Sequence, residues 1–343
     1  MGSLSGCPFL FYIITVRTLF YTNPDIIRTK MNEYGKCKLP FLFGVNYEMT
    51  EGFFIGNPLG QQDICFQMNG IGNKKVYEIP YSEVDFDSYP ISYKEYKGKF
   101  DIIYNGLHRG YSFLSNLTVK TPIETNLSLE DIFALNRAPY QLYIPQKFVC
   151  FSPERFVKIE NGLISSNPMK GTIDAYIPNA EEVILNDFKE TAEHNTIVDL
   201  IRNDLSIVAS NVRVERFRYI DRIKAHGKEI LQVSSEITGD LDRDYSNKLG
   251  DILFSLLPAG SICGAPKAAI VGLIHSAEKE PRGYYTGVFG YYDGEKLDSA
   301  VFIRFIESDK GQMYFRSGGG ITAYSKCEDE YKEVLDKIYL PFV

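Results

Sequence analysis

Two pairs of glutamates have a spacing that could hold a metal ion. Glu190 and Glu193 lie three residues apart in a segment expected to be helical, as do Glu330 and Glu333 near the end of the chain. Side chains three apart share a helix face, and carboxylate oxygens suit a hard cation such as Mg²⁺. The two pairs could therefore converge on one ion. Alternatively, they are solvated helix faces, with Lys337 as an i, i+4 partner of Glu333.

Arg304 is a candidate anion-binding residue. It lies in the segment SAVFIRFIE, which is apolar on both faces and is expected to form a strand that is covered on both sides. A buried guanidinium needs an anion, because an unpaired charge is costly to bury. The partner is either an internal Asp or Glu or the carboxylate of a ligand.

Two glycine-rich turns could also bind an anion. PAGSICGAPK (258–267) opens an apolar helix, and SGGGIT (317–322) follows a strand. Glycine lets backbone N–H groups approach an anion closely, and a helix N-terminus adds a favourable dipole. Neither turn matches the P-loop pattern, and taken alone each also fits an ordinary turn.

One lysine stands apart from other charges. Lys170 lies in SSNPMKGTIDAY, between a proline turn and a Gly–Thr pair, with no acidic residue nearer than Asp174. Taken alone it reads as a solvated loop residue. The alternative is an amine placed for chemistry, and the rest of the chain has to decide between the two.

Hairpin turns and amphipathic stretches predict the elements that position these residues. Strands over 284–292, 297–307 and 312–316 are joined by DG and DKG turns as hairpins. One long helix over 179–209 carries the first glutamate pair, and a last helix over 325–339 carries the second. Hairpins with long helices predict an α+β fold, with antiparallel sheets packed as a sandwich and helices outside. The other expected elements are short strands within 39–80, a helix around 91–109, a strand over 112–121 and strands within 140–166.

Composition limits the possible partners and the location. The net charge of −7 over 343 residues, without a basic stripe, argues against a nucleic-acid partner. Six scattered cysteines without a C-x-x-C pair predict reduced thiols and a cytoplasmic location. The apolar stretch 7–16 is too short to span a bilayer, so no membrane association is expected.

Seven blocks in a fixed order resemble the chorismate-utilising enzymes, which include anthranilate synthase and aminodeoxychorismate synthase component I, isochorismate synthase and salicylate synthase. The resemblance covers about residues 96–343. It implies an α+β sandwich with a deep pocket, in which chorismate, a dicarboxylate, binds through Mg²⁺. The blocks are SPERF (152–156), PMKGT (168–172), KETAEH…IVDLIRNDL (189–205), PAGSICGAPK, YTGVFGYYD (285–293), SGGGI and EDEYKEVLDK (328–337).

The resemblance also implies site residues and, with the sequence, domain limits. Met31 opens a polar lead into a strand, so residues 1–30 are expected to be an upstream extension that the fold does not need. Residues 31–95 would be a shortened strand-rich part and 96–343 the catalytic domain, with 31–343 as one compact unit. The implied metal ligands are Glu190, Glu193, Glu330 and Glu333, and the implied substrate-binding residues are Thr172, Gly264, Lys267, Tyr285, Arg304, Gly318, Gly319, Gly320 and Lys337.

Lys170 resembles the lysine of the aminodeoxychorismate synthases, which carry P-I-K-G-T where anthranilate synthases typically show alanine. The resemblance implies that its unprotonated amine attacks C2 of chorismate while the C4 hydroxyl leaves, with Glu154 as general acid. Ammonia then enters at C4 and expels the lysine. Burial would have to favour both the neutral amine and the protonated carboxyl.

Two departures from the family pattern and one missing block refine this interpretation. Leu114 stands where isochorismate and salicylate synthases carry a water-activating lysine, so a water-using reaction is disfavoured. Gln232 stands where many members carry a histidine linked to pyruvate elimination. The chain shows no G-x-C-x-G nucleophile block, so a glutamine amidotransferase subunit is implied as the ammonia source. The alternatives are anthranilate synthase component I and a non-catalytic chorismate-binding paralogue.

Overall fold

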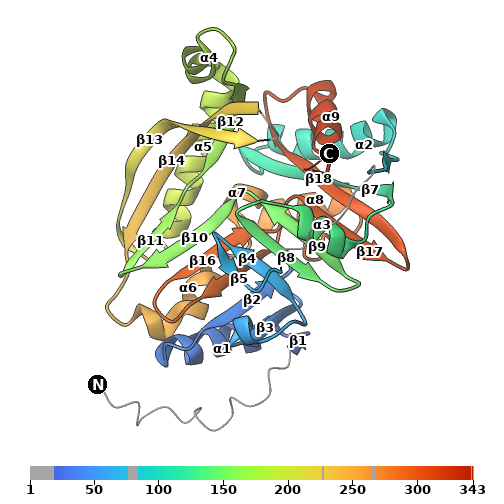
Figure 1. Cartoon of the computed structure of the whole chain (residues 1–343). Helices are drawn as coiled ribbons and strands as arrows, with labels where there is room; N and C mark the ends of the chain where they lie inside the picture. The colour runs from blue at the N-terminus through green and yellow to red at the C-terminus, as the bar shows by residue number, and fades with distance from the viewer. Residues whose placement is uncertain (1–18, 76–83, 226–227, 265–266, 341, 343) are drawn as a thin grey trace.

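The computed structural model describes residues 19–75, 84–225, 228–264, 267–340 and 342, which form two sheets with helices around them (Figure 1). The larger sheet has ten strands and the smaller has eight. Neighbouring strands in both sheets run antiparallel. Antiparallel sheets with helices confirm the predicted α+β fold.

The larger sheet combines the N-terminal strands with strands from the middle and the end of the chain. Its order is β1-β3-β2-β15-β16-β10-β11-β14-β12, with β13 also paired to β14. The strands are β1 (Leu19–Tyr21), β2 (Phe41–Val45), β3 (Gly52–Gly56), β10 (Arg155–Glu160), β11 (Leu163–Ser166), β12 (Met169–Asp174), β13 (Ser210–Ala225), β14 (Lys228–Asp240), β15 (Val288–Tyr292) and β16 (Leu297–Val301).

The smaller sheet has the order β5-β4-β8-β9-β17-β18-β7-β6. Its two longest strands, β7 and β18, pair over ten residues, and this pairing sets Asn116 opposite Gly320. The strands are β4 (Cys65–Met68), β5 (Ile71–Gly72), β6 (Phe86–Ser88), β7 (Leu114–Thr125), β8 (Tyr140–Ile144), β9 (Phe148–Ser152), β17 (Phe305–Asp309) and β18 (Gln312–Thr322).

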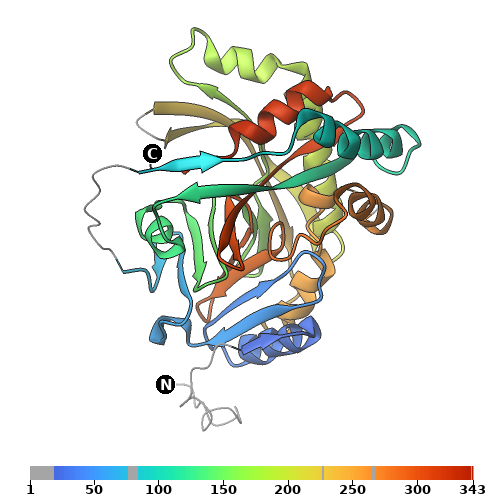
Figure 2. The same cartoon turned by 90° about the vertical axis from the view of Figure 1, so that its right-hand side faces the viewer.

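The helices lie around the two sheets (Figure 2). In the described ranges, none of them is long and apolar enough to cross a membrane. They are α1 (Pro24–Lys36), α2 (Tyr93–His108), α3 (Leu129–Leu135), α4 (Ala180–Asn186), α5 (Phe188–Leu205), α6 (Leu249–Leu256), α7 (Gly260–Cys263), α8 (Lys267–Glu278) and α9 (Cys327–Asp336), with short 3₁₀ turns at Pro58–Gly60 and Tyr245–Lys248.

Two of the three apolar cores among the described residues hold these layers together. Between the sheets, aromatic rings interdigitate: Phe289 stacks on Phe302 with centroids 4.5 Å apart, and Phe148 lies 4.7 Å from Phe305. A larger core joins side chains of α2, α5, α6 and α8 to strands of both sheets. The sheets therefore pack as a sandwich with helices outside.

Arg304 does not lie in a strand, contrary to the sequence-based prediction. The predicted strand over 297–307 is divided into β16, which belongs to the larger sheet, and β17, which belongs to the smaller one. Arg304 lies in the connection and has a φ of +52°. A non-glycine residue in this left-handed region is uncommon and marks a constrained backbone. The chain therefore changes sheets at this arginine.

The long helix predicted over 179–209 is also divided. Asp187 has extended backbone angles, with φ −63° and ψ 118°, and its side chain accepts a hydrogen bond of 2.8 Å from the Glu190 backbone N–H. Asp187 thus caps α5, because an N-cap carboxylate satisfies a backbone donor that the first helical turn leaves free. Glu190, the first residue of the glutamate pair, therefore lies in the first turn of α5.

Residues 19–30 form part of the structure that follows them. Strand β1 pairs with β3, and the fully buried Ile27 of α1 belongs to the core. The expectation of reduced thiols holds for Cys65, Cys150 and Cys327, whereas Cys37 is disulfide-bonded.

Candidate active site

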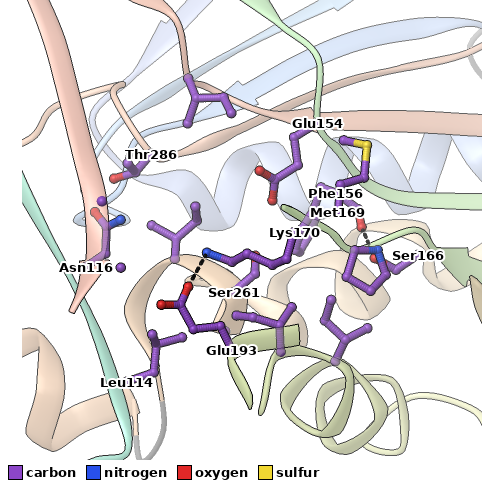
Figure 3. A pocket seen from close by; sticks show the side chains of 18 of the residues that line it. Leu114, Asn116, Glu154, Phe156, Ser166, Met169, Lys170, Glu193, Ser261 and Thr286 are labelled. Carbon is purple, nitrogen blue, oxygen red and sulfur yellow. Dashed lines mark hydrogen bonds and ion pairs between the residues drawn. The ribbon is translucent and has the colours of Figure 1, made fainter. Parts of the chain in front are cut away.

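A cavity of about 460 Å³ lies where the two sheets, α5, α7 and α9 meet (Figure 3). Most residues singled out in the sequence line it: Glu154, Lys170, Thr172, Glu190, Glu193, Tyr285, Arg304, Gly318, Gly319, Gly320, Glu333 and Lys337. Leu114 and Gln232, the two departures from the family pattern, line it as well.

Three predicted site residues do not line the cavity. The Lys267 amine is held behind two lining residues, because it pairs with Asp204 Oδ1 at 3.1 Å and donates to the Leu256 carbonyl at 2.7 Å. Gly264 lies against the Leu114 backbone, where a β-carbon would collide with the carbonyl oxygen. Glu330 is buried behind the cavity, with 1% of its surface exposed.

A bulge in β12 positions Lys170. Lys170 pairs with Val233 and Thr172 with Gln232, so Gly171 is an extra residue in the strand. Gly171 has a φ of +79°, which glycine adopts without strain. The backbone of the bulge therefore explains why a glycine follows Lys170. The Lys170 amine lies 3.6 Å from Glu193 Oε2, and 28% of its side chain is exposed.

Glu154 extends into the cavity near the Lys170 amine, from the turn between β9 and β10 (Figure 3). Its backbone N–H donates to Ser152 Oγ at 3.1 Å. Burial raises the pKa of the Glu154 carboxyl above its ordinary value, although Lys170, Lys337 and Arg304 oppose the rise. A carboxyl with a raised pKa retains its proton more readily and suits a general acid.

Four glutamates and three lysines form the helix side of the site. Burial raises the pKa values of Glu190, Glu193 and Glu330. Burial acts in the same direction on Glu333, but its pKa is lowered, chiefly because Lys337 donates to its Oε1 at 2.6 Å. The buried carboxylates therefore repel one another and favour added positive charge.

This carboxylate cluster suits Mg²⁺ in its donor type but is not arranged as a finished metal site. Two of the carboxylates approach the Gly319 backbone closely, since a β-carbon there would lie 3.2 Å from Glu333 Oε1 and 3.5 Å from Glu330 Oε2. Oxygen donors of this kind suit a hard cation. No group of three Asp, Glu, His or Cys side chains in the described ranges lies close enough to hold a metal ion. Lysine amines contact Glu193, Glu330 and Glu333 instead.

Arg304 contacts no acidic side chain in the part of the chain that the structure describes. Its Nε donates to the Tyr339 hydroxyl at 3.2 Å, and its guanidinium lies 5.4 Å from the centroid of that ring. Of the two partners considered from sequence, an internal acid and a ligand carboxylate, the internal acid is therefore not observed. Beside it, Tyr285 is buried, which raises the pKa of its hydroxyl to about 12.

Sequence reasoning missed Asn116 and Thr286, which lie close to each other in the cavity wall (Figure 3). Asn116 Oδ1 is buried and has no hydrogen-bond partner among the described residues. Thr286 has a φ of +62° although it is β-branched, an unusual conformation that indicates constraint. An unpartnered acceptor in a cavity wall is available to a ligand.

A buried ion pair behind the wall holds both residues. Arg282 and Glu278 are 1% and 4% exposed and form two hydrogen bonds of 2.6 and 2.8 Å. Arg282 also donates to the Asn116 carbonyl at 2.9 Å and to Thr286 Oγ1 at 3.3 Å. The i, i+4 spacing could have predicted an ion pair, but nothing in the sequence indicates that it reaches the cavity.

Residues 77–341 match the family of chorismate binding enzymes. The chain therefore belongs to this family of chorismate-utilising enzymes.

Curated relatives with several names match this chain. An uncharacterized PabA-like protein of Haemophilus influenzae is 49% identical over 313 residues, covering 90% of this chain and 94% of the relative. Aminodeoxychorismate synthase component 1 of Salmonella typhimurium is 31% identical over 259 residues, 71% of this chain and 56% of the relative. Anthranilate synthase component 1 of Aquifex aeolicus is 35% identical over 214 residues, 59% of this chain and 42% of the relative.

The fold is also that of a solved family member. The structure of MenF, the menaquinone-specific isochorismate synthase of Escherichia coli, superposes with a TM-score of 0.71 at 15% identity. The match covers 93% of this chain and 82% of that chain.

Proposed function

We propose that the protein is aminodeoxychorismate synthase component I, which converts chorismate and ammonia to 4-amino-4-deoxychorismate for p-aminobenzoate and folate biosynthesis. The observation that carries the proposal is the Lys170 amine in the cavity, 3.6 Å from Glu193 and near Glu154. A solvated loop lysine would not lie among the glutamates. The relative named aminodeoxychorismate synthase component 1 supports the same assignment.

In the first half of the reaction the unprotonated Lys170 amine forms a bond to C2 of chorismate. The ring double bonds shift, the C4–O bond breaks, and Glu154 gives its proton so that the hydroxyl leaves as water. The amine must leave its ion pair with Glu193 before it can attack.

In the second half, ammonia bonds to C4 and the double bonds shift back. The C2–N bond to Lys170 breaks and the lysine leaves as a neutral amine, while the new ammonium at C4 returns one proton to the Glu154 carboxylate. Chorismate and ammonia thus give 4-amino-4-deoxychorismate and water. Leu114 near the lysine cannot activate a competing water molecule, and Gln232 cannot transfer a proton near neutral pH.

Arg304, Tyr285, Lys337 and the Gly318–Gly320 backbone would bind the substrate carboxylates. Arg304 lines the cavity, and among the described residues it forms no ion pair, so its guanidinium could bind a substrate carboxylate. Glu190, Glu193, Glu330 and Glu333 would hold Mg²⁺, which would neutralise a substrate carboxylate when bound. A separate glutamine amidotransferase subunit would supply ammonia, and the proposed location is the cytoplasm.

Anthranilate synthase component I is the second candidate, because the Aquifex aeolicus relative carries that name. Incubation of the protein with chorismate, ammonium and Mg²⁺, followed by chromatography, separates the candidates. We expect aminodeoxychorismate as the product. Anthranilate would support the second candidate, and no turnover would support a non-catalytic paralogue.

Lys170→Ala tests the covalent role. We expect loss of aminodeoxychorismate formation, while Lys158→Ala, which changes a lysine outside the cavity, retains activity. Mass spectrometry of the quenched wild-type reaction is expected to show a substrate adduct on Lys170. Unchanged product formation by Lys170→Ala would reject the mechanism.

A further inference from the structure

Lys189 holds together the two glutamate-bearing helices. It lies in the first turn of α5, and its Nζ is 3.2 Å from Glu330 Oε1 on α9 and 3.9 Å from Glu193 Oε1 on its own helix. The outer part of the side chain is accessible, since 41% of it is exposed. The ammonium therefore lies between one carboxylate of each predicted metal-binding pair.

The other two lysines of the site make different contacts. Lys170 approaches the opposite oxygen, Oε2, of Glu193. Lys337 contacts Glu333 Oε1 and donates to the Gly318 carbonyl at 2.8 Å. Among the ion pairs of the described residues, only that between Lys189 and Glu330 connects α5 with α9.

The position of Lys189 has an electrostatic consequence. Glu330 is 1% exposed, and the Lys189 ammonium offsets part of the cost of burying its carboxylate. The ammonium contacts Oε1 of both Glu193 and Glu330. A divalent cation held by the same two carboxylates would lie close to the ammonium, so the two positive charges would repel each other and compete for the same negative charge.

We infer that Lys189 is an internal counterion that takes the place of the divalent cation and sets the affinity of the site for Mg²⁺. The inference rests on the proposed metal role of the glutamates. When Mg²⁺ binds, the ammonium moves outward to solvent, which its exposed position allows. When Mg²⁺ leaves, the ammonium returns and keeps α5 and α9 together.

Titration of Mg²⁺ into metal-stripped protein by calorimetry tests the inference. Lys189→Met removes the competing charge, and we expect roughly fivefold tighter Mg²⁺ binding, because a half-exposed ion pair is worth about 1 kcal/mol. Lys189→Arg retains the charge and is expected to bind Mg²⁺ about as the wild type does. Lys332→Met changes the net charge equally at an exposed position of α9 and serves as the matched control.

Thermal unfolding gives a second readout that does not require activity. Without Mg²⁺, Lys189→Met is expected to melt below the wild type, and saturating Mg²⁺ is expected to remove most of that difference. Equal Mg²⁺ affinity of wild type, Lys189→Met and Lys332→Met would overturn the counterion role alone. Absence of Mg²⁺ binding to the wild type would overturn the metal role of the glutamates as well.

Discussion

The two sides of the cavity are built on different principles. On the sheet side, Asn116 and Thr286 are fixed by the buried Glu278–Arg282 pair, and the backbone is constrained at Thr286 and Arg304. On the helix side, long lysine and glutamate side chains of α5, β12 and α9 form ion pairs. The sheet side is thus held rigidly by buried contacts, whereas the carboxylates of the helix side are neutralised by lysines on long, partly exposed side chains.

Arg282→Met would break the sheet side and is expected to have the largest effect. It leaves Glu278 buried without its partner, which destabilises a protein by about 3–5 kcal/mol. Urea unfolding measures the change. Arg202→Met removes an exposed ion pair of α5 and is expected to cost less than about 1 kcal/mol. Similar losses in the two variants would contradict the rigid role of the buried pair.

Glu154→Gln removes the proposed proton donor between the two sides. We expect kcat to fall by about 10²–10⁴-fold, the usual contribution of a general acid. The wild-type rate should fall as pH rises through the raised pKa of Glu154, because only the protonated carboxyl can donate. The variant should lack this decline. A pH–rate profile for both proteins measures the effect, and an identical decline in both would reject the assignment.

Asn116→Leu separates binding from stability on the sheet side. Oδ1 accepts no hydrogen bond from the residues that the structure describes, so its replacement by an apolar group should leave stability unchanged or slightly higher. Activity should nevertheless fall about tenfold, since a ligand donor loses its acceptor. Steady-state kinetics and thermal unfolding of the same variant provide the two readouts. A parallel loss of stability would indicate a structural role instead.

The sequence predicted the elements better than the points where they are interrupted. Periodicity identifies α9 and the strands around 284–316, but it does not reveal that Asp187 starts a new helix or that the chain changes sheets before Phe305. A single capping side chain and one left-handed residue make these breaks, and neither changes the apolar pattern. Both breaks nonetheless position the site, because they set the direction of Glu190 and Arg304.

Among the site residues, too, the sequence predicted what depends on local features and missed what depends on distant contacts. Local motifs bring Lys170 and Glu154 into the cavity because a bulge and a turn, both short-range features, direct their side chains. Lys267 was predicted to bind substrate from its place after a glycine-rich turn. Asp204, which is distant in sequence, pairs with it instead. Asn116 was missed because the sequence does not show which side chains lack a partner. Its Oδ1 can accept a hydrogen bond from a ligand only because no described residue, near or far in the chain, donates to it.

Glu190→Gln addresses the helix side with the smallest expected effect. Burial raises the pKa of Glu190 in the folded protein, so its protonated form is favoured there. This contribution to stability is present below the unfolded-state pKa and is lost as pH rises through the folded-state pKa. In metal-free protein at pH 7, the substitution should therefore raise the free energy of unfolding by less than about 1 kcal/mol. Near pH 4 it should have no such effect.

At pH 7, addition of Mg²⁺ should make the wild type more stable than Glu190→Gln, which is the reverse of their order without the ion. The wild type gains a stabilising ligand for its carboxylate, whereas the glutamine variant binds the ion less well. Glu182→Gln on the exposed face of α4 is the matched control and should shift neither curve. Thermal unfolding at both pH values, with and without Mg²⁺, measures these differences. If Glu190→Gln were destabilising in metal-free protein at pH 7, the helix side would be as rigidly satisfied as the sheet side, and the contrast between them would disappear.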